Sequence, residues 1–299
     1  MFLTVCIPTY NRGYIISRAL YSLENQTISD FEAIIVDDGS YDDTEKIVKD
    51  FLKRNHNWTY IKKSNGGKHT ALNIGIQKAE GDYFLIMDSD NYLESDCVYK
   101  LKKTINSKEY IESDESLCGV IGKCRNIRGG EIIGALFQNT FLSYIDIHFF
   151  NKGIHYGDCC ECIKTDILKK YRWPEDKRTK FVPESYVFDQ IGLKYKVFAI
   201  NDVLEYFEYM EDGITQQVES FQKRNSIGYL YGYVSTLDYI FRNINVPMMK
   251  KVSMWRLYWN SLKICTKLYG GGVQPKVKNI TPIGIMTLIF LPILNKIKR

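Results

Sequence analysis

The stretch Tyr83-Phe84-Leu85-Ile86-Met87-Asp88-Ser89-Asp90 decides the fold and points to a site. Its first five residues are an apolar run typical of a buried strand. Asp88 and Asp90 follow where such a strand emerges into a loop, on either side of the small residue Ser89. Paired carboxylates offer oxygen ligands to a hard divalent cation and leave coordination positions for phosphates. Acidic pairs after strands also occur as solvated loop ends, so the pair alone leaves both interpretations open.

Strands and helices alternate outward from this stretch through the first hundred residues. The pattern predicts strands over 3–7, 31–36, 58–61 and 83–87, and helices over 14–26, 42–53, 68–78 and, capped by Ser95, to about 105. This alternation indicates an α/β fold, with a mostly parallel sheet and helices on both faces. Ligands bind beyond the carboxyl ends of the strands in such sheets. We therefore expect three polar clusters that follow strands to converge on one edge: Pro8 to Arg12, Asp37 to Ser40, and Asp88 to Asp90.

The pattern changes after residue 117. We expect a hairpin over 120–133 that turns at Gly129-Gly130, and an irregular, mobile loop over 140–157. A strand and short helix should follow over 158–168, a helix over 183–193, and strands over 196–200 and 203–209. From about residue 220 the pattern is helical, with breaks at Asn245-Val246-Pro247 and at Gly270-Gly271-Gly272. These changes divide the chain into an α/β domain over 1–215, with halves 1–115 and 116–215, and a helical region over 216–299.

The net charge of +5 conceals an asymmetry between the two parts of the chain. Residues 239–299 contain eleven Lys and Arg and no Asp or Glu. The rest of the chain therefore has 29 basic and 35 acidic residues, a net charge of −6. Basic segments are attracted both to nucleic acids and to anionic membranes.

The run 283–294 favours a membrane over nucleic acid. It is almost wholly apolar and is bracketed by Lys276 and Lys278 before it and by Lys296, Lys298 and Arg299 after it. Twelve residues are too few to span a bilayer, but they suit a helix that lies in its interface. The alternative is an ordinary core helix in a C-terminal bundle.

The N-terminus and the eight cysteines indicate the cytosol. Residues 1–10 have neither a basic region nor a long apolar core, so we expect no signal peptide. Cysteines without such a signal are typical of a reducing compartment. Cys159, Cys160 and Cys162, near His155, could ligate zinc, but they lack a spaced second pair. Reduced, partly buried thiols are the alternative.

Four groups of residues occur in a set order in the first half: Ile7 to Arg12; Val36 to Ser40 with Asp43-Thr44; Asn65 to Lys68 with Ala71 to Asn73; and Gly81 to Tyr83 leading into Asp88-Ser89-Asp90. In this order they resemble the family 2 glycosyltransferases, which have the Rossmann-like GT-A fold, and in particular bacterial enzymes of O-antigen and capsular polysaccharide synthesis. The likeness covers residues 3 to about 95 and continues more weakly to about 210. It implies that 1–115 binds a nucleotide sugar and that 116–215 binds the acceptor. The basic charge and the apolar run, rather than the resemblance, predict that 216–299 meets the membrane.

The resemblance also implies roles for individual residues. Tyr10 would stack on the nucleotide base, Asp38 would accept a hydrogen bond from uracil, and Lys68 would meet the diphosphate. Asp90 would bind Mn²⁺ or Mg²⁺, with Asp88 at the metal or the ribose. The full donor-binding set is Pro8, Thr9, Tyr10, Arg12, Asp38, Gly67, Lys68, Asp88, Ser89 and Asp90. Many relatives have a further Asp where this chain has Asn91, which puts the number of metal ligands in doubt.

These enzymes invert the configuration of the transferred sugar, so they need a carboxylate as general base. The family places this residue in an acidic motif that opens a helix, and Glu184 occupies that place here. A Glu in the first turn also complements the helix dipole without any catalytic role. Asp158, Glu161 and Asp189 remain alternatives.

The expected function is transfer of a sugar from a UDP-sugar to a lipid-linked saccharide at the cytoplasmic face of the membrane, without nucleic acid as a partner. Whether the chain forms a homo-oligomer is open. A non-catalytic, membrane-associated partner that binds a sugar nucleotide within an assembly complex is the main rival. A nucleotidyltransferase would need a glycine-rich loop with Arg and Lys where this chain has Pro8 to Arg12.

Overall fold

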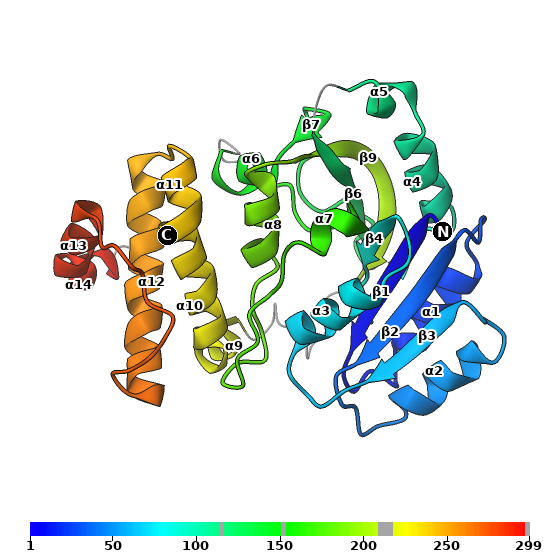
Figure 1. Ribbon diagram of the computed structural model, residues 1–299, viewed down its shortest axis with the longest axis horizontal. Coiled ribbons are helices and arrows are strands. Elements are labelled where there is room, and N and C mark those ends of the chain that lie inside the picture. The colour runs from blue at the N-terminus through cyan, green and yellow to red at the C-terminus, as the bar shows by residue number, and fades with distance from the viewer. Residues whose placement is uncertain (114–115, 151–153, 209–217, 297–299) are drawn as a thin grey trace.

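The computed structural model describes residues 1–113, 116–150, 154–208 and 218–296. It confirms an α/β fold with a helical C-terminal part (Figure 1). All the strands within these residues belong to one sheet, and the C-terminal helices lie beside the α/β part rather than over the first strands.

The sheet has nine strands in the order β3-β2-β1-β4-β8-β6-β9-β5, with β7 paired to β9. The first four strands of this path are parallel, and β8 runs antiparallel to both β4 and β6. Every residue of β1 and β2 is buried, which explains their continuous apolar sequence. The strands are β1 (Leu3–Thr9), β2 (Phe31–Asp37), β3 (Trp58–Lys62), β4 (Tyr83–Ile86), β5 (Tyr92–Leu93), β6 (Leu117–Asn126), β7 (Phe141–Leu142), β8 (Cys159–Lys164) and β9 (Lys196–Phe207).

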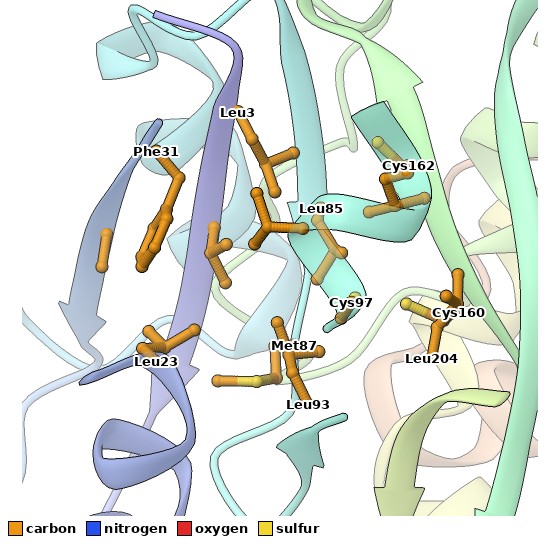
Figure 2. Close-up of a cluster of buried hydrophobic side chains, with 14 of the residues drawn as sticks. Leu3, Leu23, Phe31, Leu85, Met87, Leu93, Cys97, Cys160, Cys162 and Leu204 are labelled. Atoms are coloured by element: carbon orange, nitrogen blue, oxygen red, sulfur yellow. The ribbon is translucent and has the colours of Figure 1, made fainter. Parts of the chain in front are cut away.

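Helices cover both faces of the sheet, each through an apolar stripe of residues three or four positions apart. One core contains buried residues of α1, α2 and α4, and Figure 2 shows part of it, with Leu23 facing Phe31 and Met87 beside Leu93. The other core contains residues of α3, α7 and α8. The helices of this part are α1 (Ile16–Glu24), α2 (Thr44–Leu52), α3 (Lys68–Lys78), α4 (Cys97–Ile105), α5 (Lys108–Ile111), α6 (Tyr144–Phe149), α7 (Thr165–Leu168) and α8 (Ser185–Gly192).

The C-terminal helices have a core of their own, centred on Trp255 and Tyr258 of α12. Figure 1 shows α10 next to α8, α12 on the other side of α10, and α13 and α14 at the far edge. The breaks expected at Pro247 and Gly270 lie at the two ends of α12. Within the described ranges, none of the helices has the length and hydropathy needed to cross a membrane. The helical elements are α9 (Val218–Arg224), α10 (Ser226–Ser235), the π-helical turn η2 (Thr236–Ile240), α11 (Phe241–Asn243), α12 (Met248–Tyr269), α13 (Pro282–Ile289) and α14 (Leu291–Leu294).

Three local expectations are wrong, and a fourth is met only in part. The cap of α4 is Asp96, not Ser95, and its side chain makes no capping hydrogen bond. The strands expected at 196–200 and 203–209 are one strand, β9, with irregular register against β6; residue 209 lies outside the described residues. The expected loop 140–157 contains β7 and α6, although residues 151–153 also lie outside the described part.

The fourth is the hairpin over 120–133, which forms but is short. The backbone N–H of Asn126 donates to the Glu131 carbonyl at 3.0 Å and that of Ile133 to the Cys124 carbonyl at 3.1 Å, on either side of a bridge between Arg125 and Ile132, so the chain turns around Gly129-Gly130 as expected. The main partners of β6 are β8 and β9.

Candidate active site

The three polar clusters meet in one pocket at the carboxyl ends of β1, β2 and β4, as the topology predicts. The pocket has a volume of about 670 Å³. The second half of the chain closes it, through the start of β8, the start of α8 and the end of β9. Of the predicted site residues, those that line it are Pro8, Thr9, Tyr10, Arg12, Asp38, Lys68, Asp88, Ser89, Asp90 and Glu184.

Asp88 and Asp90 lie in a tight turn directly after β4. The backbone N–H of Asn91 donates to the carbonyl of Asp88 at 3.0 Å, and Arg18 donates to the carbonyl of Asp90. The guanidinium of Arg12 is 3.9 Å from the Asp90 carboxylate. Burial, and then the charge of Asp88, raises the pKa of Asp90, so negative charge is under-compensated here. A cation would relieve that excess.

The two carboxylates suit Mn²⁺ or Mg²⁺ held partly by substrate phosphates. They do not form a site in which the protein supplies every ligand. Across the described ranges, no three His, Cys, Asp or Glu side chains are grouped so that they could hold a metal ion. Ions of this type are commonly held by one or two carboxylates together with substrate phosphates and water. Asp88 and Asp90 could supply those carboxylates, and the open pocket leaves room for the other ligands.

Lys68 connects the acidic pair to the second half of the chain. Its Nζ lies 2.5 Å from Asp88 Oδ1 and 2.9 Å from Glu184 Oε1. Burial alone would lower the pKa of Lys68, but the charges of Asp88 and Glu184 outweigh it and raise that pKa well above its usual value. Lys68 is therefore a fixed positive charge between the two carboxylates, at the first residue of α3.

The loop before Lys68 is held by Asp38. The Asp38 carboxylate accepts hydrogen bonds from the backbone N–H of Gly66 at 2.8 Å and of Gly67 at 2.6 Å, and from the Lys63 ammonium at 2.6 Å. Gly67 has φ of 99°, and a Cβ there would lie 1.9 Å from the carbonyl oxygen of Lys180. Asp38 thus lines the pocket, but its carboxylate oxygens accept hydrogen bonds from the loop. The sequence alone does not reveal that Asp38 holds this loop.

Tyr10 presents an exposed ring at the pocket rim. It packs edge-to-face with Tyr41, with ring centroids 6.3 Å apart. The next residue, Asn11, has φ of 51° and turns the chain away from β1. Thr9 is buried, and its hydroxyl has no hydrogen-bond partner in the part of the chain that the structure describes. Tyr10 is 44% exposed, so part of its side chain is open to a ligand at the rim.

Glu184 is at the N-cap of α8, one third exposed and directed at Lys68. The other base candidates differ from it in their surroundings. Asp189 is buried, and its Oδ1 lies 2.5 Å from His148 Nδ1, so the carboxylate already has a partner. Burial raises the pKa of Asp158, and raises that of Glu161 far more. Glu184 is partly exposed in the pocket and lies beside Lys68, and this geometry favours it as the base.

Sequence reasoning missed Glu205 and His148, which also line the pocket. Burial raises the pKa of Glu205 to about 8, and Asn91 Nδ2 donates to its Oε1 at 2.7 Å. Asn91 thus joins the acidic turn to β9. The acidic residue in an otherwise apolar stretch, Val203-Leu204-Glu205, is the one signal that could have identified Glu205.

The cysteines of β8 pack in the sheet. Cys160 and Cys162 are fully buried, Cys159 is partly exposed, and all eight cysteines are free thiols. Burial raises the pKa of the Cys159 thiol to about 12. Across the described ranges, these thiols belong to no group of three or more side chains that could hold a metal ion.

Comparisons with known proteins agree with this geometry. The model of glycosyl transferase family 2 matches residues 4–170. The poly(ribitol-phosphate) beta-glucosyltransferase of Bacillus spizizenii is 34% identical over 144 residues, which cover 47% of this chain and 22% of that protein. The chain thus spans about a fifth of the length of this relative.

Two solved structures share the fold. S. aureus TarS 1-349 in complex with UDP-GlcNAc matches with a TM-score of 0.62 and 19% identity, over 97% of this chain and 80% of that one. The mannosyltransferase PcManGT from Pyrobaculum calidifontis, in complex with GDP-Man and Mn²⁺, matches with a TM-score of 0.56 and 16% identity, over 99% and 81%. At these identities the likeness concerns the fold alone.

Proposed function

Because the chain belongs to glycosyl transferase family 2, we propose that it transfers a sugar from a UDP-sugar to a saccharide acceptor, with inversion at the anomeric carbon. The observation that carries this proposal is the placement of Lys68 between Asp88, beside the predicted diphosphate site, and Glu184. Sugar transfer in polysaccharide biosynthesis is supported by relatives named chondroitin synthase and hyaluronan synthase, and sugar transfer in general by the poly(ribitol-phosphate) beta-glucosyltransferase.

The donor would lie across the edge of the sheet. The exposed ring of Tyr10 would stack on the base, and the Asp38-bound loop would bring Lys68 to the diphosphate. Asp90, with Asp88, would hold Mn²⁺ or Mg²⁺. When bound, such an ion neutralises negative charge on the departing diphosphate. The solved complexes of fold neighbours with UDP-GlcNAc, and with GDP-Man and Mn²⁺, make a sugar nucleotide and a divalent ion reasonable choices.

Glu184 would act as the general base. Its carboxylate accepts the proton of an acceptor hydroxyl, whose oxygen forms a bond to the anomeric carbon of the donor. The bond from that carbon to the diphosphate oxygen breaks on the opposite side, and UDP leaves with its electron pair. A single displacement of this kind inverts the configuration. Lys68, which contacts both Glu184 and Asp88, is placed to balance charge on either side of the reacting carbon.

The acceptor in this proposal is a saccharide on a lipid diphosphate, met at the cytoplasmic face of a bacterial membrane during O-antigen or capsule assembly. The basic C-terminal region supports this choice because it suits an anionic surface. Exposed apolar residues of α13 and α14 also support it.

The test is release of UDP, GDP or dTDP from a panel of sugar nucleotides, with Mn²⁺, Mg²⁺ or EDTA and a synthetic lipid-diphosphate sugar as acceptor. We expect turnover of a UDP-sugar that EDTA abolishes. Failure to bind any sugar nucleotide would refute the proposal. Tight binding of a UDP-sugar without turnover would instead favour the non-catalytic partner of an assembly complex.

A further inference from the structure

The C-terminal helices α13 and α14 expose an unusual density of large apolar side chains. Ile289 is 63% exposed and Ile293 is 59% exposed. Only Gly284 and Thr287 of these two helices are buried. We define the docking surface as the exposed residues Ile285, Met286, Leu288, Ile289, Phe290 and Ile293. Six large apolar side chains within nine residues form a contiguous patch, which normally marks an interaction site.

Specific contacts hold the docking surface in place on α12. Gly284 packs against the ring of Trp255, where a Cβ would lie 2.7 Å from a ring atom, and Trp259 Nε1 donates to the Gly284 carbonyl at 3.0 Å. Arg256 donates to the carbonyl of Leu294 at 3.1 Å, and the side-chain amides of Asn260 and Asn295 pair at 2.9 Å. The patch is therefore preformed, with its apolar side chains turned away from the helix that carries it.

Positive charge surrounds this patch. Arg256, Asn260, Lys263 and Lys267 follow one another at helical spacing, so the two lysines continue along the face of α12 that contacts α14. Lys263, Lys267 and Lys296 are exposed. The sequence has no acidic residue after Asp238 to offset them.

We propose that the docking surface inserts into the headgroup layer of an anionic lipid bilayer, with the lysines of α12 on lipid phosphates. Apolar insertion combined with cation–phosphate attraction is the way in which interfacial helices bind. A second copy of the chain fits less well, because pairing two such surfaces would bring like charges together. That the acceptor is lipid-linked depends on the proposed function. Membrane binding by the docking surface is inferred separately, from the contacts and charges of the C-terminal helices.

The experiment is sedimentation of the full chain with vesicles of phosphatidylcholine, alone or with phosphatidylglycerol, in the absence of any sugar nucleotide. We expect binding only to vesicles that contain phosphatidylglycerol, weakening as salt rises. Ile289→Asp should lower the partition coefficient by about tenfold or more, because a charge replaces an inserted apolar group. Lys263→Gln with Lys267→Gln should lower the partition coefficient by roughly thirtyfold, because each lysine near an anionic surface contributes to binding.

The matched control is Ile111→Asp on α5, since Ile111 is 66% exposed and lies outside the C-terminal helices. It should bind vesicles as the unaltered chain does. Equal binding by Ile289→Asp and Ile111→Asp would overturn the inference. So would a dimer in light scattering that Ile289→Asp dissociates, if vesicle binding stays unchanged. Turnover of the UDP-sugar without an acceptor should be the same in all variants. A failure of vesicle binding can therefore be distinguished from a failure of the proposed catalytic function.

Discussion

At the scale of single residues, His69 shows how the fold sets an ionisation state. It is 1% exposed in α3, and neither ring nitrogen has a hydrogen-bond partner among the residues that the structure describes. Burial lowers the pKa of His69 to about 4 from an ordinary 6.5. The imidazole is therefore neutral at pH 7. As the pH falls, His69 takes up a proton in the unfolded chain at a higher pH than in the folded chain.

His69 should make the protein less stable in mild acid. Between pH 6.5 and 4 the unfolded chain binds a proton at His69 that the folded chain does not, so the free energy of unfolding falls as the pH falls. Above pH 6.5 His69 causes no loss of stability. Between pH 6.5 and pH 4 the free energy of unfolding falls by roughly 3 kcal/mol because of His69. Urea unfolding at a series of pH values should show this slope, and His69→Leu should flatten it. An unchanged slope in His69→Leu would contradict the assignment.

At the scale of elements, Asp38 joins the end of β2 to the loop that opens α3. Its carboxylate accepts from two backbone N–H groups and from the Lys63 ammonium. One carboxylate thus fixes the position of Lys68, which is the first residue of the helix. Any uracil contact by Asp38 would have to share these oxygens with the loop.

Replacing Asp38 should therefore damage both stability and donor binding. Asp38→Ala leaves the backbone N–H groups of Gly66 and Gly67 without their acceptor and removes one of three acceptors of the Lys63 ammonium, which should lower the free energy of unfolding by about 2–4 kcal/mol. UDP affinity should fall together with stability because Lys68 loses its support. Asp43→Ala is the control, since Asp43 is exposed at the start of α2 and makes no capping hydrogen bond. Similar urea midpoints for the two variants would show that the loop does not depend on Asp38.

Much of this architecture could be predicted from sequence, and the failures have physical causes. β1 and β2 follow from their continuous apolar sequences, because both faces of these strands are buried. β9 could not be read as one strand, since the exposed residues Asn201 and Asp202 interrupt its apolar pattern where its register against β6 shifts. Glu205 and Asn91 are 114 positions apart, and nothing local signals such a pair. The residues of the acidic turn were predictable, but their partners were not.

At the scale of the whole molecule, the C-terminal helices support the segment that leads to Glu184. Asn225 Oδ1 accepts from the backbone N–H of Lys180 at 3.0 Å. Gly228 of α10 lies so close to this segment that a Cβ would be 1.6 Å from the carbonyl oxygen of Phe181. The position of the predicted base therefore depends on the helical part of the chain as well as on the sheet.

Gly228→Ala should disturb this contact between the two parts. The methyl group cannot fit without backbone movement, so we expect a loss of about 2–4 kcal/mol in stability and lower turnover. Gly232→Ala, one turn later in the same helix, is the matched control, because its nearest neighbour would be 3.9 Å away. Higher helix propensity should make that variant slightly more stable, by up to about 1 kcal/mol. Equal thermal midpoints for the two variants would show that α10 does not press on the Phe181 segment.

The central claim is that Glu184 takes the proton while Asp90 holds the diphosphate through a metal ion. The most direct test measures UDP binding by calorimetry with Mn²⁺, and sugar transfer, for Glu184→Gln and Asp90→Asn. We expect Glu184→Gln to bind UDP as the unaltered protein does, with transfer reduced by roughly 10²–10⁴-fold. Asp90→Asn should lose both. Transfer by Glu184→Gln at close to the full rate would contradict the account and return Asp158 and Glu161 as candidates for the base.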